Sequence, residues 1–179
     1  MNARHMLKRH ARAVLVLIAL ACLASVGGAL FAQHRFGMEP CPWCILQRIL
    51  FLAIAVVALL AAALPVGGPG RLSAVLSSVL SSVLVAGLGV AGGAAALYQN
   101  LVAAKLPSCD MTLADRIVSG LGLDAWQPEV FEVRSSCADA AVSLLGVPFE
   151  LWSFGLFALI TLIAAGLVLA AFMPEPDNM

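Results

Sequence analysis

The chain has 179 residues, of which 62% are hydrophobic and only 11% are charged. Soluble domains use roughly half apolar and a quarter charged residues, so this composition indicates an integral membrane protein. The formal net charge is zero, and the 10 basic residues are spread along the chain. No basic patch of the kind that binds nucleic acid is present, so we expect no nucleic-acid partner.

Four stretches are long and apolar enough to cross a bilayer, which takes about 20 mostly apolar residues. They are Ala13–Ala32, Ile45–Leu64, Leu72–Leu97 and Leu151–Met173. We expect an all-α membrane protein, a four-transmembrane-helix bundle that forms one membrane domain over residues 1–179. A basic start and an apolar run are also typical of a cleaved signal peptide. The first run is long for that, and cleavage after Ala32 would put bulky Leu30 where a small residue is needed.

Two features inside the apolar stretches are expected to serve packing. The sequence Gly89-Val-Ala-Gly-Gly93 in the third stretch supplies small residues that let a neighbouring helix come close in lipid. Cys22 lies inside the first stretch and is expected to be a small apolar filler without a partner.

The basic residues near the spans predict the orientation, because lysine and arginine are retained on the cytoplasmic side. Those concerned are Arg4, Lys8, Arg9 and Arg12 before the first span, and Arg71 after the Pro-Gly-rich turn. Residues 1–12, 65–71 and 174–179 are therefore expected in the cytoplasm. Residues 33–44 and 98–150 then form two loops on the outer side.

The first outer loop ends in a closely spaced pair of cysteines, Cys41 and Cys44. Two thiols at this spacing can close a small disulfide, and the N-terminal end of the following helix favours a thiolate at Cys44. Arg48 lies one turn further along the same helix face and adds a full positive charge. A zinc site would need a second close pair or histidines. The remaining outer cysteines are 28 residues apart, so we expect a redox pair and no metal.

Arg48 has two interpretations. It could be an interfacial anchor whose long side chain reaches to water. It lies on the outer side, however, where the positive-inside bias disfavours it, and a charge just inside the bilayer costs a few kcal/mol. We therefore expect Arg48 to serve the function of the protein.

The second outer loop carries Cys109 and Cys137 and is too long for a simple connector. Between the cysteines, Leu113–Leu123 has apolar groups at helical spacing, which predicts a short amphipathic segment on the membrane surface. Pro128 should end or bend the helix before it. A disulfide in such an exposed loop would be exchangeable, although a structural clamp on the loop is the alternative.

These residues resemble the DsbB family, the disulfide-bond formation proteins of the bacterial inner membrane, over nearly the whole chain. Members of that family work with DsbA and quinone to keep the periplasm oxidising. The four spans match in order, and the most specific stretch is the run from Gly37 to Arg48. Other matching residues are Gln33, Gln99, Pro107-Ser-Cys109-Asp, Cys137-Ala, Leu145-Gly146 and Trp152.

The resemblance implies an enzyme, a protein-thiol:quinone oxidoreductase with cytoplasmic termini and periplasmic loops. Cys109 and Cys137 would form the disulfide that oxidises a periplasmic thioredoxin-fold, DsbA-like partner, with Cys109 in the mixed disulfide. Electrons would pass to Cys41 and Cys44, and Cys44 would deliver them to ubiquinone or menaquinone near Arg48. The lipid bilayer and its quinone pool would be the other partners.

One stretch departs from the family pattern. Family members often carry an arginine or histidine at the outer end of the third span, where it can help bind quinone, but residues 94–96 are alanines here. Gln99 and Tyr98 are the candidates to replace that donor.

Other readings stay open at this stage. The chain could be a specialised paralogue with a different partner, or a non-catalytic four-span protein with structural loop disulfides, although such a protein does not need Cys41-Pro-Trp-Cys44 beside Arg48. A thiol-reducing conduit would need cysteines reachable from the cytoplasm, and only Cys22 lies within a span.

Overall fold

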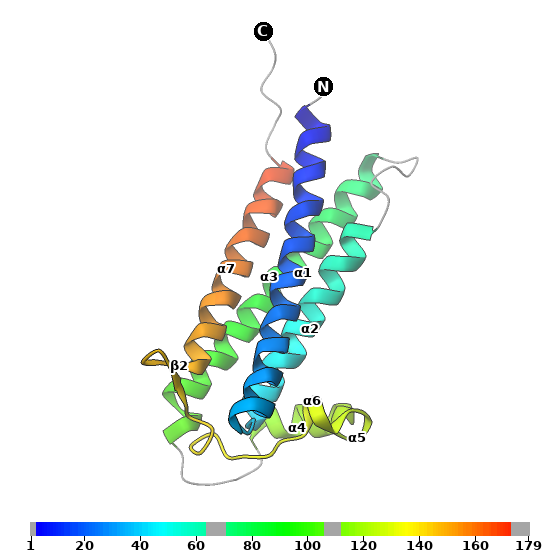
Figure 1. Cartoon of the computed structure of the whole chain (residues 1–179). Coiled ribbons are helices and arrows are strands. Elements are labelled where there is room, and N and C mark those ends of the chain that lie inside the picture. The colour runs from blue at the N-terminus through cyan, green and yellow to red at the C-terminus, as the bar shows by residue number, and fades with distance from the viewer. Residues whose placement is uncertain (1–2, 64–70, 106–111, 173–179) are drawn as a thin grey trace.

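The structure of the chain is a computed structural model that describes residues 3–63, 71–105 and 112–172, with side chains described from residue 11 and, in the second range, from residue 76. Four long helices run alongside one another in these ranges (Figure 1). They are α1 (Ala3–Phe36), α2 (Pro42–Ala63), α3 (Arg71–Leu101) and α7 (Phe149–Phe172). Each contains a stretch long and apolar enough to cross a membrane: Ala11–Phe36, Pro42–Ala63, Leu76–Lys105 and Phe149–Phe172. The predicted all-α, four-helix membrane bundle is confirmed.

The helices extend a few residues beyond the predicted spans. α1 continues to Phe36, and the chain leaves it through Gly37, whose φ of 64° suits a residue without a side chain. The start of the first loop is therefore helical. Most of the predicted turn at residues 65–71 and the tail at 174–179 lie outside the described residues, and Arg71 is the first residue of α3.

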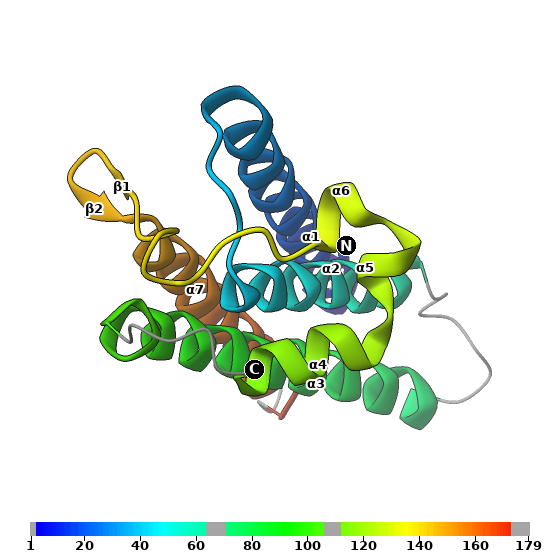
Figure 2. The ribbon, with the colours of Figure 1, turned by 90° about the horizontal axis from the view of Figure 1, so that it is seen from below.

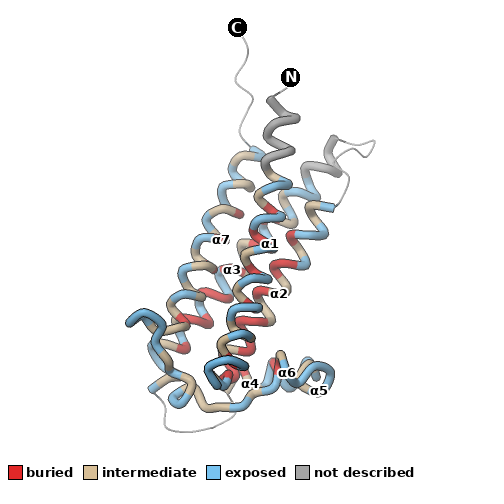
Figure 3. Tube along the Cα trace, viewed as in Figure 1, coloured by how far each residue is buried: buried red, intermediate tan, exposed pale blue. Residues whose placement is uncertain are grey.

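α2 packs against both α1 and α3, and α3 packs along α7. The side chains buried between the helices include Cys22, Phe51, Ile54 and Phe157, and the rings of Phe51 and Phe157 stack with centroids 3.9 Å apart. Figure 3 shows the buried positions on the facing sides of the helices and exposed positions on their outer sides. The interpretation of Cys22 as a buried filler is confirmed, since its exposure is 0%.

Small residues on α3 allow α7 to approach closely. A Cβ atom built at Gly92 would overlap the ring of Phe157, and one at Gly89 would overlap the side chain of Thr161. A Cβ at Gly87 would meet nothing within 4 Å. The predicted packing role of this glycine-rich stretch is therefore confirmed.

The first turns of α1 and the last turns of α7 lie at one end of the bundle, and the described parts of the connections that follow α1 and α3 lie at the other (Figure 1). The second connection contains η1 (Ala103–Lys105), α4 (Leu113–Leu121), α5 (Leu123–Trp126), α6 (Pro128–Phe131) and an antiparallel hairpin of β1 (Ser143–Leu144) and β2 (Val147–Pro148). Figure 2 shows α4 to α6 gathered beside the ends of α2 and α3, with the hairpin beside α7.

The predicted amphipathic segment is α4. Thr112 and Asp115 form a capping box at its start, and Gly122 ends it with a φ of 61°. Ala114 and Val118 are buried against the bundle, while leucines on the other side are exposed. Pro128 is the first residue of α6, so it separates two short helices as expected. Contact between α4 and the membrane surface stays a prediction.

Candidate active site

Cys41 and Cys44 lie at the start of α2 as a close thiol pair. Their sulfur atoms are 3.0 Å apart, and the backbone N–H of Cys44 donates a hydrogen bond to the Cys41 sulfur at 3.4 Å. The helix begins at Pro42, so the first turn of α2 holds both side chains. A disulfide needs the sulfurs to move to about 2.05 Å. The pair can therefore open and close with a small change in the surrounding chain.

Cys137 comes from the second loop and lies against Cys41. Its thiol forms a hydrogen bond with the Cys41 thiol, and both cysteines belong to one apolar cluster with Ala95 and Ala114. The backbone N–H of Arg134 donates to the carbonyl oxygen of Pro40 at 3.0 Å. This bond joins the two loops at positions just before Cys41 in the first and Cys137 in the second.

The hydrogen bond between Cys137 and Cys41 makes the two thiols unequal. It raises the pKa of Cys41, to which the bond with Cys44 and burial also contribute, and it lowers the pKa of Cys137. Since the thiolate is the nucleophile in disulfide exchange, Cys137 is the more readily activated sulfur of this pair. The remaining candidate cysteine, Cys109, lies outside the described residues, so its pairing with Cys137 stays a prediction.

Two glutamines form a chain of hydrogen bonds that ends on Cys44. Gln47 Nε2 donates to Gln99 Oε1 at 2.7 Å, and Gln99 Nε2 donates to the Cys44 sulfur at 3.2 Å. Both amides are buried. An N–H directed at the sulfur favours a thiolate there. Tyr98, the other candidate donor, instead places its ring 4.6 Å from that of Trp43.

Arg48 is buried, with 6% of its surface exposed, and does not extend to water as an interfacial anchor would. Its Nη1 donates to Gln33 Oε1 at 2.9 Å and to the carbonyl oxygen of Val130 at 3.0 Å. Gln33 in turn donates to the carbonyl oxygen of Glu129 at 3.3 Å. Arg48 thus joins α1, α2 and the second loop, and no carboxylate among the described residues pairs with it.

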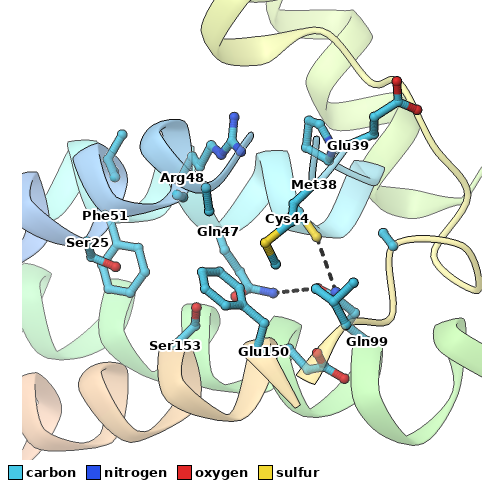
Figure 4. A pocket seen from close by; sticks show the side chains of 17 residues that line it. Ser25, Met38, Glu39, Cys44, Gln47, Arg48, Phe51, Gln99, Glu150 and Ser153 are labelled. Carbon is cyan, nitrogen blue, oxygen red and sulfur yellow. Dashed lines mark hydrogen bonds between the residues drawn. The ribbon is translucent and has the colours of Figure 1, made fainter. Parts of the chain in front are cut away.

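A cleft with about 650 Å³ of unfilled space, its open mouth included, lies beside Cys44. Residues of α1, α2, α3 and α7 and of both loops line it (Figure 4). Its polar side chains include Cys44, Gln47, Arg48 and Gln99, and its apolar wall includes Val26, Ala29, Phe51 and Phe149. Cys41 does not line it. Cys44 is therefore the cysteine of the pair that faces the cleft.

The family pattern described as Disulfide bond formation protein DsbB matches residues 11–167 of the chain. The chain belongs to the DsbB family. It is similar to Disulfide bond formation protein B 1 of Pseudomonas entomophila (strain L48), at 36% identity over 152 residues, which cover 85% of this chain and 86% of that relative. It is also similar to Disulfide bond formation protein B of Ralstonia nicotianae, at 35% over 150 residues (82% and 87%), and of Burkholderia pseudomallei (strain K96243), at 34% over 160 residues (89% and 90%).

Membership in the DsbB family confirms the resemblance seen in the sequence. It makes this chain a multi-pass membrane protein of disulfide bond formation and an oxidoreductase by class. Of the predicted site residues, the structure brings Cys41, Cys44, Cys137, Arg48 and Gln99 to one end of the bundle.

Sequence reasoning missed the partners of these side chains. The amide of Gln47 holds Gln99, the backbone carbonyl of Val130 accepts from Arg48, and the carboxyl of Glu150 lines the cleft. Gln47 could have been found, because it lies between Cys44 and Arg48 in a motif already singled out. A backbone carbonyl carries no sequence signal.

Proposed function

We propose that the protein reoxidises a periplasmic thioredoxin-fold, DsbA-like dithiol and passes the electrons to membrane quinone, either ubiquinone or menaquinone. It would do so in the bacterial inner membrane, with both termini in the cytoplasm. The observation that carries the proposal is the chain of contacts from the Cys137 thiol through Cys41 to Cys44, which ends at a cleft. A protein with purely structural loop disulfides does not need such a series.

The cleft fits a quinone in its chemistry. The apolar groups of α1 and α7 suit a ring that arrives from the lipid, and the polar side chains gather near Cys44. Bound there, a quinone would supply a two-electron, two-proton acceptor. Arg48 and the amides of Gln47 and Gln99 would hold it, and the positive charge of Arg48 would stabilise negative charge that develops on an oxygen.

The proposed thiol steps combine the contacts of Cys137, Cys41 and Cys44 with the role that the family resemblance implies for Cys109, which lies outside the described residues. A partner thiolate attacks the Cys109–Cys137 disulfide at Cys109, and the mixed disulfide resolves into an oxidised partner and two loop thiols. The Cys137 thiolate then attacks Cys41 in the Cys41–Cys44 disulfide, which frees Cys44 as a thiolate beside Gln99. Cys109 attacks Cys137 and releases Cys41, so two electrons have moved to the inner pair and the loop disulfide is restored.

The direct test is anaerobic mixing of the purified protein with quinone and a reduced thioredoxin-fold partner, followed through quinone absorbance. Loss of quinone absorbance in step with partner oxidation supports the proposal. Cys44→Ala should stop quinone reduction while Cys109 still traps the partner as a mixed disulfide, and Cys109→Ala should prevent the trapping. A Cys109→Ala protein that oxidises its partner at an undiminished rate would reject this relay order.

Arg48 offers a separate test of the acceptor site. A charge-assisted hydrogen bond is worth about 1.5–3 kcal/mol, so Arg48→Ala should lower apparent quinone affinity or turnover by roughly tenfold to a hundredfold. Arg48→Lys should recover only part of the loss because the planar fork is gone. Partner exchange at Cys109, measured separately, reports whether the variant is folded. Normal quinone kinetics in Arg48→Ala would move the acceptor site elsewhere.

A further inference from the structure

Glu150 gives the cleft a buried carboxyl group. It is the second residue of α7, 5% of its surface is exposed, and its side chain lines the cleft with Cys44, Gln47 and Arg48. Figure 4 shows Glu150 and Arg48 on opposite sides of Gln47. Its Oε1 accepts a hydrogen bond from Asn100 Nδ2 at 2.9 Å. The relay of thiols described above makes no use of this group.

The proposed reaction moves protons as well as electrons. A dithiol that becomes a disulfide gives up two electrons and two protons, and a quinone that becomes a quinol takes up the same number of each. The amides and the guanidinium that line the cleft are poor proton donors. Two lining residues carry carboxyl groups, Glu39 and Glu150, and only Glu150 is buried.

We propose that Glu150 is the proton donor of the cleft, a catalytic residue that passes a proton from its carboxyl oxygen to an oxygen of the bound quinone. The carboxyl regains its proton from the outer water, which also supplies the second proton of the quinol through the open mouth of the cleft. The two thiols release two protons into that water, so electrons and protons balance over each cycle. With quinone bound, Arg48 would stabilise the developing negative charge, and Glu150 would supply a proton. This inference rests on the proposed quinone reduction.

A structural role for Glu150 is the alternative. A carboxylate in the first turn of a helix is favoured by the helix dipole, and the bond to Asn100 joins α3 to α7. Glu150→Gln separates the two roles, because the amide oxygen can still accept from Asn100 while the acid is lost. Asn100→Ala removes the same bond and keeps the acid.

The experiment compares these two variants with the wild-type chain, in full-length protein reduced by a small dithiol. A general acid typically contributes about a hundredfold or more, and water at the open mouth can replace part of it, so Glu150→Gln should slow quinol formation by roughly tenfold to a hundredfold. Asn100→Ala should change it by less than about threefold. As a readout besides turnover, binding of a non-reducible quinone analogue should produce an infrared carboxyl difference band that Glu150→Gln lacks.

Either of two results overturns the proposal while leaving quinone reduction intact. One is a Glu150→Gln protein with wild-type turnover and an unchanged carboxyl band. The other is an Asn100→Ala protein that loses as much activity as Glu150→Gln, which would make the bond to α3 the important feature. A wild-type protein that reduces no quinone removes the proposed function and this inference together.

A second surface is independent of the quinone. Leu145 and Gly146 form the turn between β1 and β2, and both have positive φ. Tight turns of this kind usually take glycine or asparagine at these positions. Leucine occupies the first position and is 86% exposed, and Leu144 and Trp152 are each 49% exposed. The indole N–H of Trp152 donates to the carbonyl oxygen of Leu144 at 3.4 Å and holds the hairpin against α7.

The position of this hairpin indicates which environment its exposed apolar tip contacts. It joins the first residue of the α7 span directly, and in Figure 1 it projects sideways from the bundle beside the first turns of that helix. Residues 140–149 contain no charged side chain. Trp152 has the apolar body and polar tip that favour the membrane interface. We infer that the tip of the hairpin inserts into the outer interfacial layer of the bilayer.

The test places a spin label at Leu145→Cys in a full-length variant whose other cysteines are replaced, reconstituted in lipid nanodiscs. Leu162→Cys, 71% exposed in the middle of α7, is the lipid control, and Ala138→Cys in the same loop is the water control. The label at 145 should be more accessible to oxygen than to a water-soluble nickel complex, as at 162. The inference is overturned if the label at 145 is as accessible to the nickel complex as the label at 138. It is also overturned if the label at 145 is protected from the nickel complex only when a thioredoxin-fold protein is added.

Discussion

Replacing Arg48 by alanine removes the side chain that fastens the second loop to the bundle, so it should loosen that loop measurably. The two bonds from Nη1, to Gln33 Oε1 and to the Val130 carbonyl, are charge-assisted and buried. Each such bond contributes about 1.5–3 kcal/mol, but bonds in one network are not additive, and water can enter from the cleft. We expect the free energy of local opening to fall by about 2–3 kcal/mol, which is a roughly 30- to 140-fold rise in the open population.

Amide hydrogen exchange measures this opening without any quinone. The amides of Phe131 and Glu132 donate within α6, and that of Arg134 donates to the Pro40 carbonyl, so their exchange reports on the docked loop. Exchange at these three sites should accelerate by the factor above in Arg48→Ala. Arg134→Gln is the matched control, since its pairs with Glu129 and Glu132 are partly exposed and worth at most about 1 kcal/mol. An acceleration of less than about threefold in Arg48→Ala, or an equal acceleration in Arg134→Gln, would show that the Arg48 side chain does not hold the second loop against the bundle.

Three further predictions address packing, ionisation and topology. Gly92→Ala should lower the free energy of unfolding by about 1–3 kcal/mol because the added methyl group overlaps the ring of Phe157 on α7. Gly87→Ala should not lower it, because the methyl group there meets open space. Unfolding in detergent measures the free energy for both variants. Because the hydrogen bond to Cys41 lowers the pKa of Cys137, alkylation of reduced Cys137 should persist to lower pH than for a free thiol. Cys41→Ala should shift the midpoint pH of Cys137 alkylation upward. An unchanged midpoint would contradict the effect of this hydrogen bond on Cys137. A membrane-impermeant thiol reagent should label reduced Cys109 of intact cells but not Cys22, which is buried in the first span. Labelling of Cys109 only after the inner membrane is opened would contradict the predicted topology.

Much of the site could be predicted because it is local in the chain. Cys44 and Arg48 lie one turn apart on α2, and Cys41 immediately precedes that helix, so the helix start and its periodicity set the mutual positions of all three residues. The same holds for the capping box of α4, whose two side chains are three residues apart. The glycines of α3 could be assigned to packing, although the sequence does not say that α7 is the helix that fills the space.

Contacts between distant segments could not be predicted in the same way. Arg48 and Val130 are 82 residues apart, and Gln33 and Glu129 are 96 apart. The sequence left Cys137 paired only by resemblance, and the folded loop places its thiol against Cys41. Such contacts depend on where a loop of about fifty residues folds back, and polar residues there have many possible partners of similar energy.

The sequence by itself determined that this is a four-helix membrane protein with a closely spaced pair of cysteines at the start of the second span. Both properties follow from the length of apolar runs and from spacing along one helix, which the bilayer and the backbone impose on any chain of this pattern. Only the tertiary structure decided that Cys44 rather than Cys41 faces the cleft, that Gln47 and Gln99 hold it, and that Glu150 joins the same wall. These facts depend on how four helices and a folded loop pack together, because a side chain meets residues of other segments only once the chain has brought them into contact.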